Sequence, residues 1–247
     1  KTKNSPIHNR STSVTMRLER LDAPAVLRSA DAVCFDVDST VIRIEGIDAL
    51  AQHLGVGSAV AALTAQAMGG DVPFHQALEQ RLDVMRPSRT QLSAMLETHP
   101  PDAMLTPGIR ALVARLTARG TRVFLVSGGF RQMIEPVARL LDIPASDIFA
   151  NRLLFDNVGA FAGHDASEPT SRAGGKAKVV ADLKAAHGYD SVVMVGDGAT
   201  DMEARDVPGG ADAFIGFGGI KERAAVKAGA DWYVYSFDEI MAELPRT

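Results

Sequence analysis

The sequence has one cysteine, Cys34, among its 247 residues. A single cysteine excludes an internal disulfide and any zinc site built from several thiolates, and it is typical of a reducing compartment. Long hydrophobic runs are absent, since the longest fall well short of the roughly 18 apolar residues that a membrane helix needs. We therefore expect an intracellular, soluble protein with no membrane partner. An excess of positive charge is also absent: 26 Lys and Arg face 30 Asp and Glu. This balance argues against a nucleic-acid partner, although it leaves room for a local basic patch.

Hydrophobic residues make up 46% of the chain and charged residues 23%, which is ordinary for a globular protein with a sizeable core. The first 20 residues differ, because they are basic and rich in hydroxyl groups and contain no acid before Glu19. Such a segment fits either a transit peptide or a disordered extension ahead of Met16, and we favour the extension. We accordingly expect a cytoplasmic protein, with the plastid as the alternative. We expect a monomer or a homodimer.

Beyond residue 30, short apolar runs alternate with amphipathic segments. Runs that read as buried strands cover residues 32–35, 123–126, 192–195 and 213–215, with a weaker one at 232–235. Helical patterns between them include residues 107–120 and 176–187. Strands that alternate with helices in this way predict an α/β fold: a Rossmann-like parallel sheet with helices on both faces.

Residues 46–104 break this alternation, because they contain helical segments and no strand candidate. The segments are residues 47–54, 59–67, 74–84 and 91–97. A helical insertion after the first strand reads as a cap over the carboxyl edge of the sheet, where ligands bind in open α/β folds. We expect a core of residues 21–45 and 105–247, a cap of residues 46–104, and hinges near 41–46 and 100–106. A β-hairpin is expected over residues 153–161.

Four short polar motifs lie where predicted strands end or predicted helices begin. They are Asp36 with Asp38, Ser127-Gly128-Gly129, Lys176, and Asp197 with Asp201. Each alone has an ordinary explanation, since Asp and Ser often cap helices and Ser-Gly pairs often form turns. The surroundings of Lys176 also fail as a Walker loop, because Thr170 and Ala177 replace the required glycine and hydroxyl residue.

Taken together, the motifs place four carboxylates at one sheet edge. The four are Asp36, Asp38, Asp197 and Asp201, and they would repel one another strongly at low dielectric. One divalent hard cation with oxygen ligands resolves this repulsion, and Mg²⁺ fits best. The six histidines show no ligand spacing that would favour zinc. With a lysine, a serine hydroxyl and glycine amides added, the site suits phosphoryl transfer.

These motifs make the chain similar to the haloacid dehalogenase-like hydrolases. The matching stretches are VCFDVDSTVIRIEGID, AMGGDVPFHQAL, LTPGIRALV, VFLVSGGFRQMI, IFANRLLF, EPTSRAGGKAK and VGDGATDMEAR. They occur in family order between about residues 30 and 240 and extend into the cap, where substrate choice resides. The resemblance implies an Mg²⁺-dependent phosphomonoester hydrolase whose substrate is phosphoserine, acting in the last step of serine biosynthesis.

The resemblance also implies the catalytic roles. Asp36 would attack phosphorus and form an aspartyl-phosphate, while Asp38 would protonate the leaving oxygen and then activate water. Asp38 must start protonated for this role, so its pKa must be raised by its surroundings. Asp36, the main-chain carbonyl of Asp38, and Asp197 would hold Mg²⁺, and Asp201 would orient them.

The implied substrate contacts come from the core and the cap. In the core, the phosphoryl group would be held by Ser127, Gly128, Gly129, Lys176 and Thr200. At the junction with the cap, Glu45 would bind the ammonium, and in the cap Arg81 would bind the carboxylate, with Met68, Gly69, Gly70 and Phe74 around them. Arg81 also fits a surface cation and Met68 ordinary packing, and Arg223 is a candidate contact with no defined role.

Two other functions fit the same residues. One is a phosphatase or phosphotransferase of the same fold for another small phosphate ester. The other is a non-catalytic protein that binds phosphate and regulates. The pair of Glu45 and Arg81 favours an amino-acid substrate, and the chemically competent residue at every motif position favours catalysis.

Overall fold

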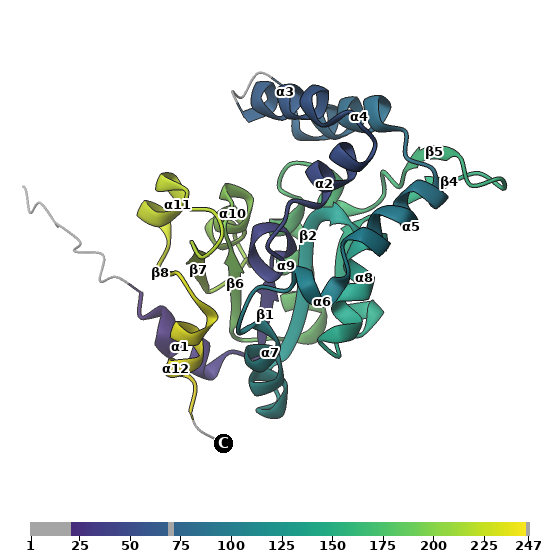
Figure 1. The fold of residues 1–247 in the computed structure, drawn as a ribbon. Coiled ribbons are helices and arrows are strands. Elements are labelled where there is room, and N and C mark those ends of the chain that lie inside the picture. The colour runs from purple at the N-terminus through teal and green to yellow at the C-terminus, as the bar shows by residue number, and fades with distance from the viewer. Residues whose placement is uncertain (1–20, 69–71, 246–247) are drawn as a thin grey trace, which may run out of the picture.

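The computed structural model describes residues 21–68 and 72–245, so the predicted extension over residues 1–20 lies outside the described residues. Six strands form one parallel sheet in the order β3-β2-β1-β6-β7-β8 (Figure 1). They are β1 (Ala32–Phe35), β2 (Arg122–Phe130), β3 (Ile148–Asn151), β6 (Val192–Gly196), β7 (Ala213–Phe217) and β8 (Trp232–Val234). All five expected strands are present, and β3 is a sixth that the sequence analysis did not predict.

Each central strand is buried on both faces, and alternate side chains point to opposite helical layers. In β1, Val33 and Phe35 pack into one cluster and Ala32 and Cys34 into the other. The first layer contains α1 (Ala23–Ser29), α7 (Ile109–Ala118), α8 (Arg131–Leu140) and α12 (Phe237–Glu243). The second contains α9 (Gly175–His187), α10 (Ala199–Asp206) and α11 (Ala224–Gly229). The predicted α/β fold with helices on both faces is confirmed.

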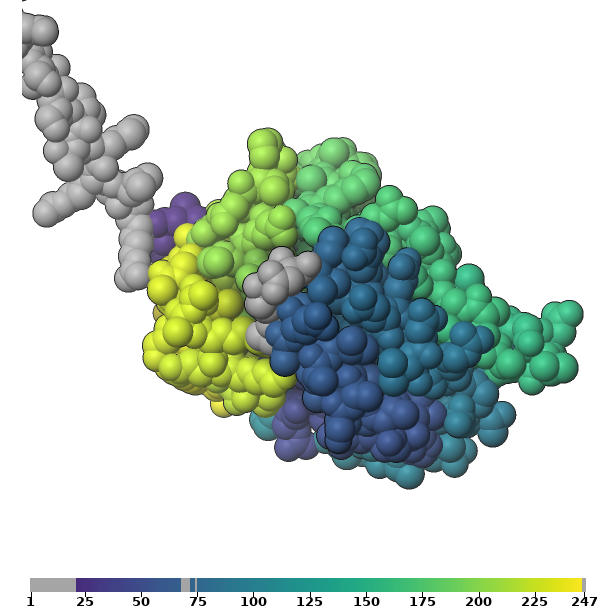
Figure 2. Space-filling view, turned by 90° about the horizontal axis from the view of Figure 1, so that it is seen from above, coloured from purple at the N-terminus to yellow at the C-terminus, as the bar shows by residue number. Residues whose placement is uncertain are grey.

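The insertion after the first strand contains only helices in its described part. They are α2 (Gly46–His53), α3 (Gly57–Met68), α4 (Phe74–Met85), α5 (Arg89–Thr98) and the short α6 (Pro101–Met104). Ser88 starts α5 through a capping box with Gln91. Helices α2 to α5 share a hydrophobic cluster around Leu50, Leu82 and Met95. Figure 1 shows α2, α3 and α4 beyond one end of the sheet strands, and Figure 2 shows the insertion from above. The exact division into cap and core stays a prediction.

Two connectors join these helices to the sheet, and they run side by side. Ile42 pairs with Leu105 in an antiparallel bridge, and the Arg43 amide donates to the Met104 carbonyl at 2.9 Å. The first connector includes a π-type turn, η1 (Val37–Val41). The remaining elements are 3-10 turns η2 (Ala145–Asp147) and η3 (Pro169–Ser171) and the expected hairpin of β4 (Leu153–Phe155) and β5 (Phe161–His164). None of the helices in the described part of the chain has both the length and the apolar character to cross a bilayer.

Candidate active site

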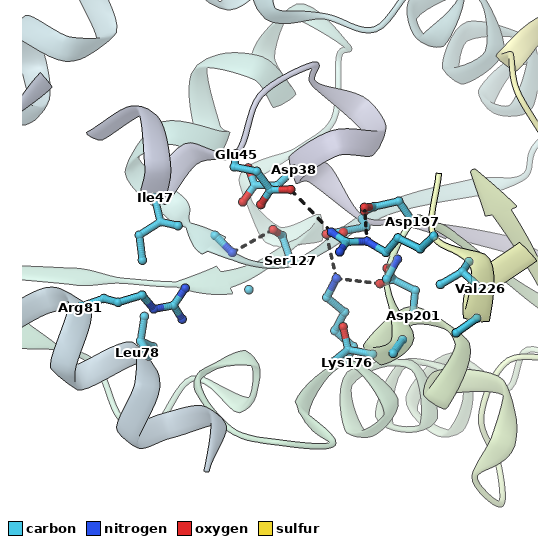
Figure 3. Close-up of a pocket in the computed structure, with 18 of the residues that line it drawn as sticks. Asp38, Glu45, Ile47, Leu78, Arg81, Ser127, Lys176, Asp197, Asp201 and Val226 are labelled. Atoms are coloured by element: carbon cyan, nitrogen blue, oxygen red, sulfur yellow. Dashed lines mark hydrogen bonds and ion pairs between the residues drawn. The ribbon is translucent and has the colours of Figure 1, made fainter. Parts of the chain in front are cut away.

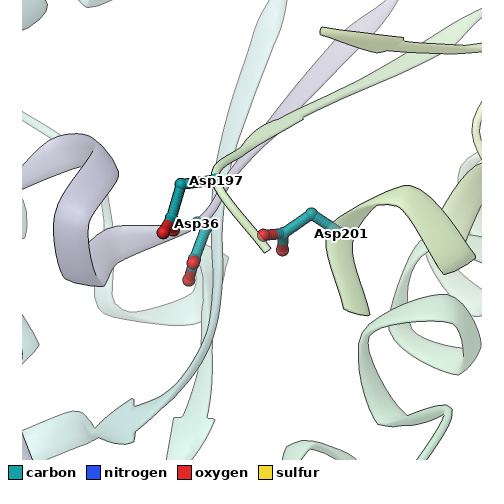
Figure 4. Close-up of side chains that lie close together, drawn as sticks. All are labelled: Asp36, Asp197 and Asp201. Carbon is teal, nitrogen blue, oxygen red and sulfur yellow. The ribbon is translucent and has the colours of Figure 1, made fainter. Parts of the chain in front are cut away.

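The carboxyl edge of the sheet brings three buried aspartates together. Asp36 directly follows β1 and Asp197 directly follows β6, and these strands are parallel neighbours. Asp201 comes from the first turn of α10. The three side chains are almost inaccessible to solvent, and one oxygen from each lies within 4.8 Å of the others (Figure 4). Three of the four acids that were predicted to gather at this edge therefore form one cluster.

Two cations from neighbouring elements contact these carboxylates. The Lys176 ammonium, in the first turn of α9, lies 2.8 Å from Asp36 Oδ1 and 2.7 Å from Asp201 Oδ1. Arg223 Nε lies 3.0 Å from Asp197 Oδ2. Burial works against the charge on Lys176, but the two carboxylates outweigh it and raise its pKa. Lys176 is therefore a fixed cation between two acids.

The buried aspartates still repel one another electrostatically. Burial, followed by the charge of Asp36, raises the pKa of both Asp197 and Asp201. The grouped donors are all carboxylate oxygens, with no thiolate or imidazole in the cluster found among the described residues. A buried donor set of this kind fits a hard divalent cation. The Asp38 side chain is not part of this cluster. The atom of Asp38 that we predict to bind the metal is its main-chain carbonyl oxygen.

Asp38 lies beside the cluster, in the turn after Asp36. Its Oδ1 accepts a hydrogen bond from the Gly46 amide at 3.2 Å. Burial, and then the charges of Glu45 and Asp36, raise the pKa of Asp38 well above its ordinary value. Gly129 leaves room for this carboxyl group, because a Cβ there would lie 3.0 Å from Asp38 Oδ2 and 3.1 Å from Ser127 Oγ. Asp38 thus has the elevated pKa that a proton donor requires.

A pocket of about 600 Å³ separates this edge from helices α2 and α4. Figure 3 shows Arg81 and Leu78 on α4, across the pocket from Lys176, Asp197 and Asp201. Arg81 Nε donates to the Ala77 carbonyl at 2.9 Å, which anchors the side chain along its own helix. Among the contacts recorded for the described residues, its terminal nitrogens take no ion-pair partner, and they are available to an anion in the pocket.

Glu45 stands at the start of α2 and also lines the pocket. Its Oε1 accepts from Ser39 Oγ and from Lys221 Nζ, each at 2.7 Å. Ser39 has left-handed backbone torsions, with φ of 55°, and this conformation places its hydroxyl against Glu45. Burial opposes the charge on Glu45, but the hydrogen bonds from Lys221 and Ser39 hold its pKa below the ordinary value. Glu45 is therefore an anion at neutral pH.

Most of the predicted site residues line this one pocket. They are Asp36, Asp38, Glu45, Arg81, Ser127, Gly128, Gly129, Lys176, Asp197, Thr200, Asp201 and Arg223. Gly69 and Gly70 lie outside the described residues. Met68 and Phe74 are described only as the last residue of α3 and the first of α4. The structure thus brings the predicted groups together, and their roles stay predictions.

Several residues at or near the pocket were not singled out from the sequence. Ile47 and Leu78 supply apolar surface, and Ser39 and Lys221 hold Glu45. Leu78 was within reach of sequence reasoning, because it precedes Arg81 by three residues and so shares its helix face. Lys221 gave no signal, because 176 residues separate it from Glu45.

Comparisons with known proteins identify the family. The haloacid dehalogenase-like hydrolase family model matches residues 33–205. The phosphoserine phosphatase of Bos taurus is 56% identical over 87% of this chain and 94% of its own length. The chloroplastic phosphoserine phosphatase of Arabidopsis thaliana is 54% identical over 88% of this chain and 72% of its own length.

Solved structures show the same fold. DsGPDH of Dunaliella salina has a TM-score of 0.80 and 39% identity over 90% of this chain, which spans only 37% of that protein. A phospho-aspartyl intermediate analogue of phosphoserine phosphatase has a TM-score of 0.73 and 26% identity, over 87% of this chain and 98% of that one. This chain therefore belongs to the haloacid dehalogenase-like hydrolase family, and within that family it groups with the phosphoserine phosphatases.

Proposed function

We propose that the protein hydrolyses O-phospho-L-serine to serine and phosphate, with Mg²⁺ and through an aspartyl-phosphate on Asp36, as the last step of serine biosynthesis. One observation carries the proposal: a single pocket is lined by the buried aspartates, Lys176 and the Glu45 carboxylate, with the Arg81 guanidinium on the opposite side. Phosphoserine has a phosphate, an ammonium and a carboxylate, and each finds a group of opposite charge there. The names of the relatives from cattle and Arabidopsis support the same substrate.

Substrate binding would use both walls of the pocket. The Arg81 guanidinium would receive the carboxylate in a bidentate pair, and Glu45 would receive the ammonium. The phosphoryl oxygens would take hydrogen bonds from Lys176, from the Ser127 hydroxyl, and from amides of Gly128 and Gly129, with Thr200 adding a hydroxyl. This arrangement fixes phosphorus near Asp36 before reaction, which is the main requirement of phosphoryl transfer.

The first chemical step is attack by Asp36. The Val37 amide donates to Asp36 Oδ1 at 2.7 Å, and Lys176 contacts the same oxygen. Because both described contacts use Oδ1, Oδ2 is the oxygen available for attack. The bond between Oδ2 and phosphorus forms as the bond between phosphorus and the serine oxygen breaks, and Asp38 gives its proton to that oxygen.

The second step returns the site to its starting state. Asp38, now ionised, takes a proton from a water molecule, whose oxygen attacks phosphorus. The bond between phosphorus and Asp36 breaks, phosphate leaves, and Asp36 is again a carboxylate. The raised pKa of Asp38 supports both transfers, because its neutral form persists toward neutral pH.

Asp36, Asp197 and the main-chain carbonyl of Asp38 would hold Mg²⁺, with Asp201 orienting the site. When bound, Mg²⁺ supplies positive charge that offsets the acids and the developing charge on the phosphoryl group. Residues 46–104 would act as a cap on a core of residues 21–45 and 105–247, with its hinges at the paired connectors. Closure would keep water out while the aspartyl-phosphate forms.

The test is phosphate release by the purified protein. We expect turnover of L-phosphoserine with Mg²⁺, loss of activity with a chelator, and recovery when Mg²⁺ is added back. Phosphothreonine and sugar phosphates serve as comparison substrates. A preference for one of these would favour another small ester, and no release from any of them would favour the non-catalytic alternative.

For the compartment we propose the cytoplasm, with the plastid as alternative. The Arabidopsis relative is named chloroplastic, which supports the alternative. Sequencing the amino terminus of the mature protein tests it, because import into a plastid removes the transit segment.

A further inference from the structure

Lys221 contacts Glu45 from outside the pocket. It belongs to the loop between β7 and α11, and its Nζ lies 2.7 Å from Glu45 Oε1. Glu45 lines the pocket, whereas Lys221 is not among the lining residues. The Lys221 side chain is 44% exposed and the Glu45 side chain 25%. The lysine therefore approaches from the solvent side and does not fill the space that a ligand would occupy.

The recorded contacts of the Glu45 carboxylate fall on one oxygen. Oε1 accepts from the Ser39 hydroxyl and from Lys221, and Arg223 Nη2 lies 3.9 Å from the same atom. Within the described residues, Oε2 takes no recorded hydrogen bond or ion pair. A carboxylate fixed through one oxygen presents the other in a defined direction, which is how preorganised sites recognise a cation.

We propose that Lys221 is a positioning residue for recognition of the substrate ammonium, holding Glu45 Oε1 so that Oε2 faces the pocket. This rests on the proposed function, in which Glu45 binds the ammonium. Lys221 also joins the loop after β7 to the connector that leads into α2, so it fixes Glu45 against the core. Its own charge repels the ammonium only weakly, because a half-exposed lysine is screened by water.

The role predicts a change in substrate discrimination. The paired substrates are L-phosphoserine and the phosphate ester of 3-hydroxypropanoate, which has hydrogen in place of the ammonium. For Lys221→Met we expect the KM for phosphoserine to rise about fivefold, toward the upper end of what a partly exposed ion pair contributes. We expect kcat on phosphoserine and both constants on the ester without ammonium to stay as in the wild type.

Two variants serve as controls. Lys221→Arg keeps the cation and is expected to restore most of the affinity for phosphoserine. Lys178→Met removes an exposed lysine whose partner is Asp182, on the surface of α9, and is expected to change neither substrate. Thermal melting of each variant checks that the fold is intact. A purely structural role for Lys221 would lower activity on both substrates alike, and that result would overturn the proposal.

The wild type and Glu45→Gln separate this inference from the proposed function. The wild type should prefer phosphoserine over the ester without ammonium, and Glu45→Gln should remove that preference. If either of those two results is not obtained, the proposal that Glu45 recognises the ammonium is wrong. With those two results and an unchanged KM in Lys221→Met, only the positioning role is wrong.

Discussion

Replacing Arg81 by alanine tests how the pocket recognises an amino acid. The Arg81 side chain is partly buried, and its Nε donates to the Ala77 carbonyl, so the side chain loses little conformational entropy when it binds a ligand. Its terminal nitrogens can form a bidentate, charge-assisted pair with a carboxylate, worth about 3 to 4 kcal/mol when two such bonds act together. Since each 1.4 kcal/mol is a factor of ten, kcat/KM for phosphoserine should fall about 100- to 1,000-fold.

The assay compares phosphoserine with O-phosphoethanolamine, which keeps the phosphate and ammonium but lacks the carboxylate. Arg81→Ala should leave steady-state phosphate release from phosphoethanolamine unchanged, because that ester offers Arg81 nothing to bind. Arg81→Lys keeps a positive charge but loses the planar fork, so its loss on phosphoserine should be intermediate. Equal losses on both esters would refute the reasoning, because they would show that Arg81 acts on the fold or on the phosphate.

Two further predictions concern the aspartates that follow β1. Asp36→Asn should abolish phosphate release with no fall in melting temperature, since the amide cannot attack phosphorus; Mg²⁺-dependent turnover in this variant would contradict the nucleophile assignment. Asp38→Asn should raise the melting temperature at about pH 7 but not at about pH 3, when both are measured without divalent cations. The reason is that the pKa of Asp38 is about 3.9 in the unfolded chain and higher in the folded protein. Its ionisation therefore costs the wild type stability as the pH rises, and an equal gain at both pH values would show that the charge is not the cause.

The central strands were predictable because their burial is continuous. Val192–Gly196 and Ala213–Phe217 are buried at every position, so each reads as an unbroken apolar run. Strand β3 was missed for a physical reason. Ile148–Asn151 is an edge strand with one half-buried position and an asparagine at its end, so it lacks the unbroken apolar run that marks the equally short β1. Its place in the sheet comes from pairing with β2, which is a tertiary interaction.

The acidic edge of the sheet was predictable because parallel strands direct their carboxyl ends to one side. Once residues 32–35 and 192–195 were recognised as strands, Asp36 and Asp197 had to lie near each other. The surroundings of Glu45 follow no such rule. Its partners come from a left-handed serine six residues earlier and from a lysine 176 residues later, and neither contact leaves a periodic pattern. Local geometry at strand ends is encoded in short motifs, whereas contacts between loops depend on the finished fold.

Asp201 shows how the structure refines a motif that the sequence had already located. Its carboxylate is fully buried, accepts from the Gly198 amide at 2.9 Å and from Lys176 at 2.7 Å, and lies within the acidic cluster. A Cβ on Gly196 would lie 2.3 Å from the Asp201 carboxyl group, so only glycine fits at the end of β6. Gly196 therefore leaves the space that the Asp201 side chain occupies. The glycine, Asp201 and Lys176 form one packed unit, and a larger residue at position 196 would displace the acid that holds the lysine against Asp36.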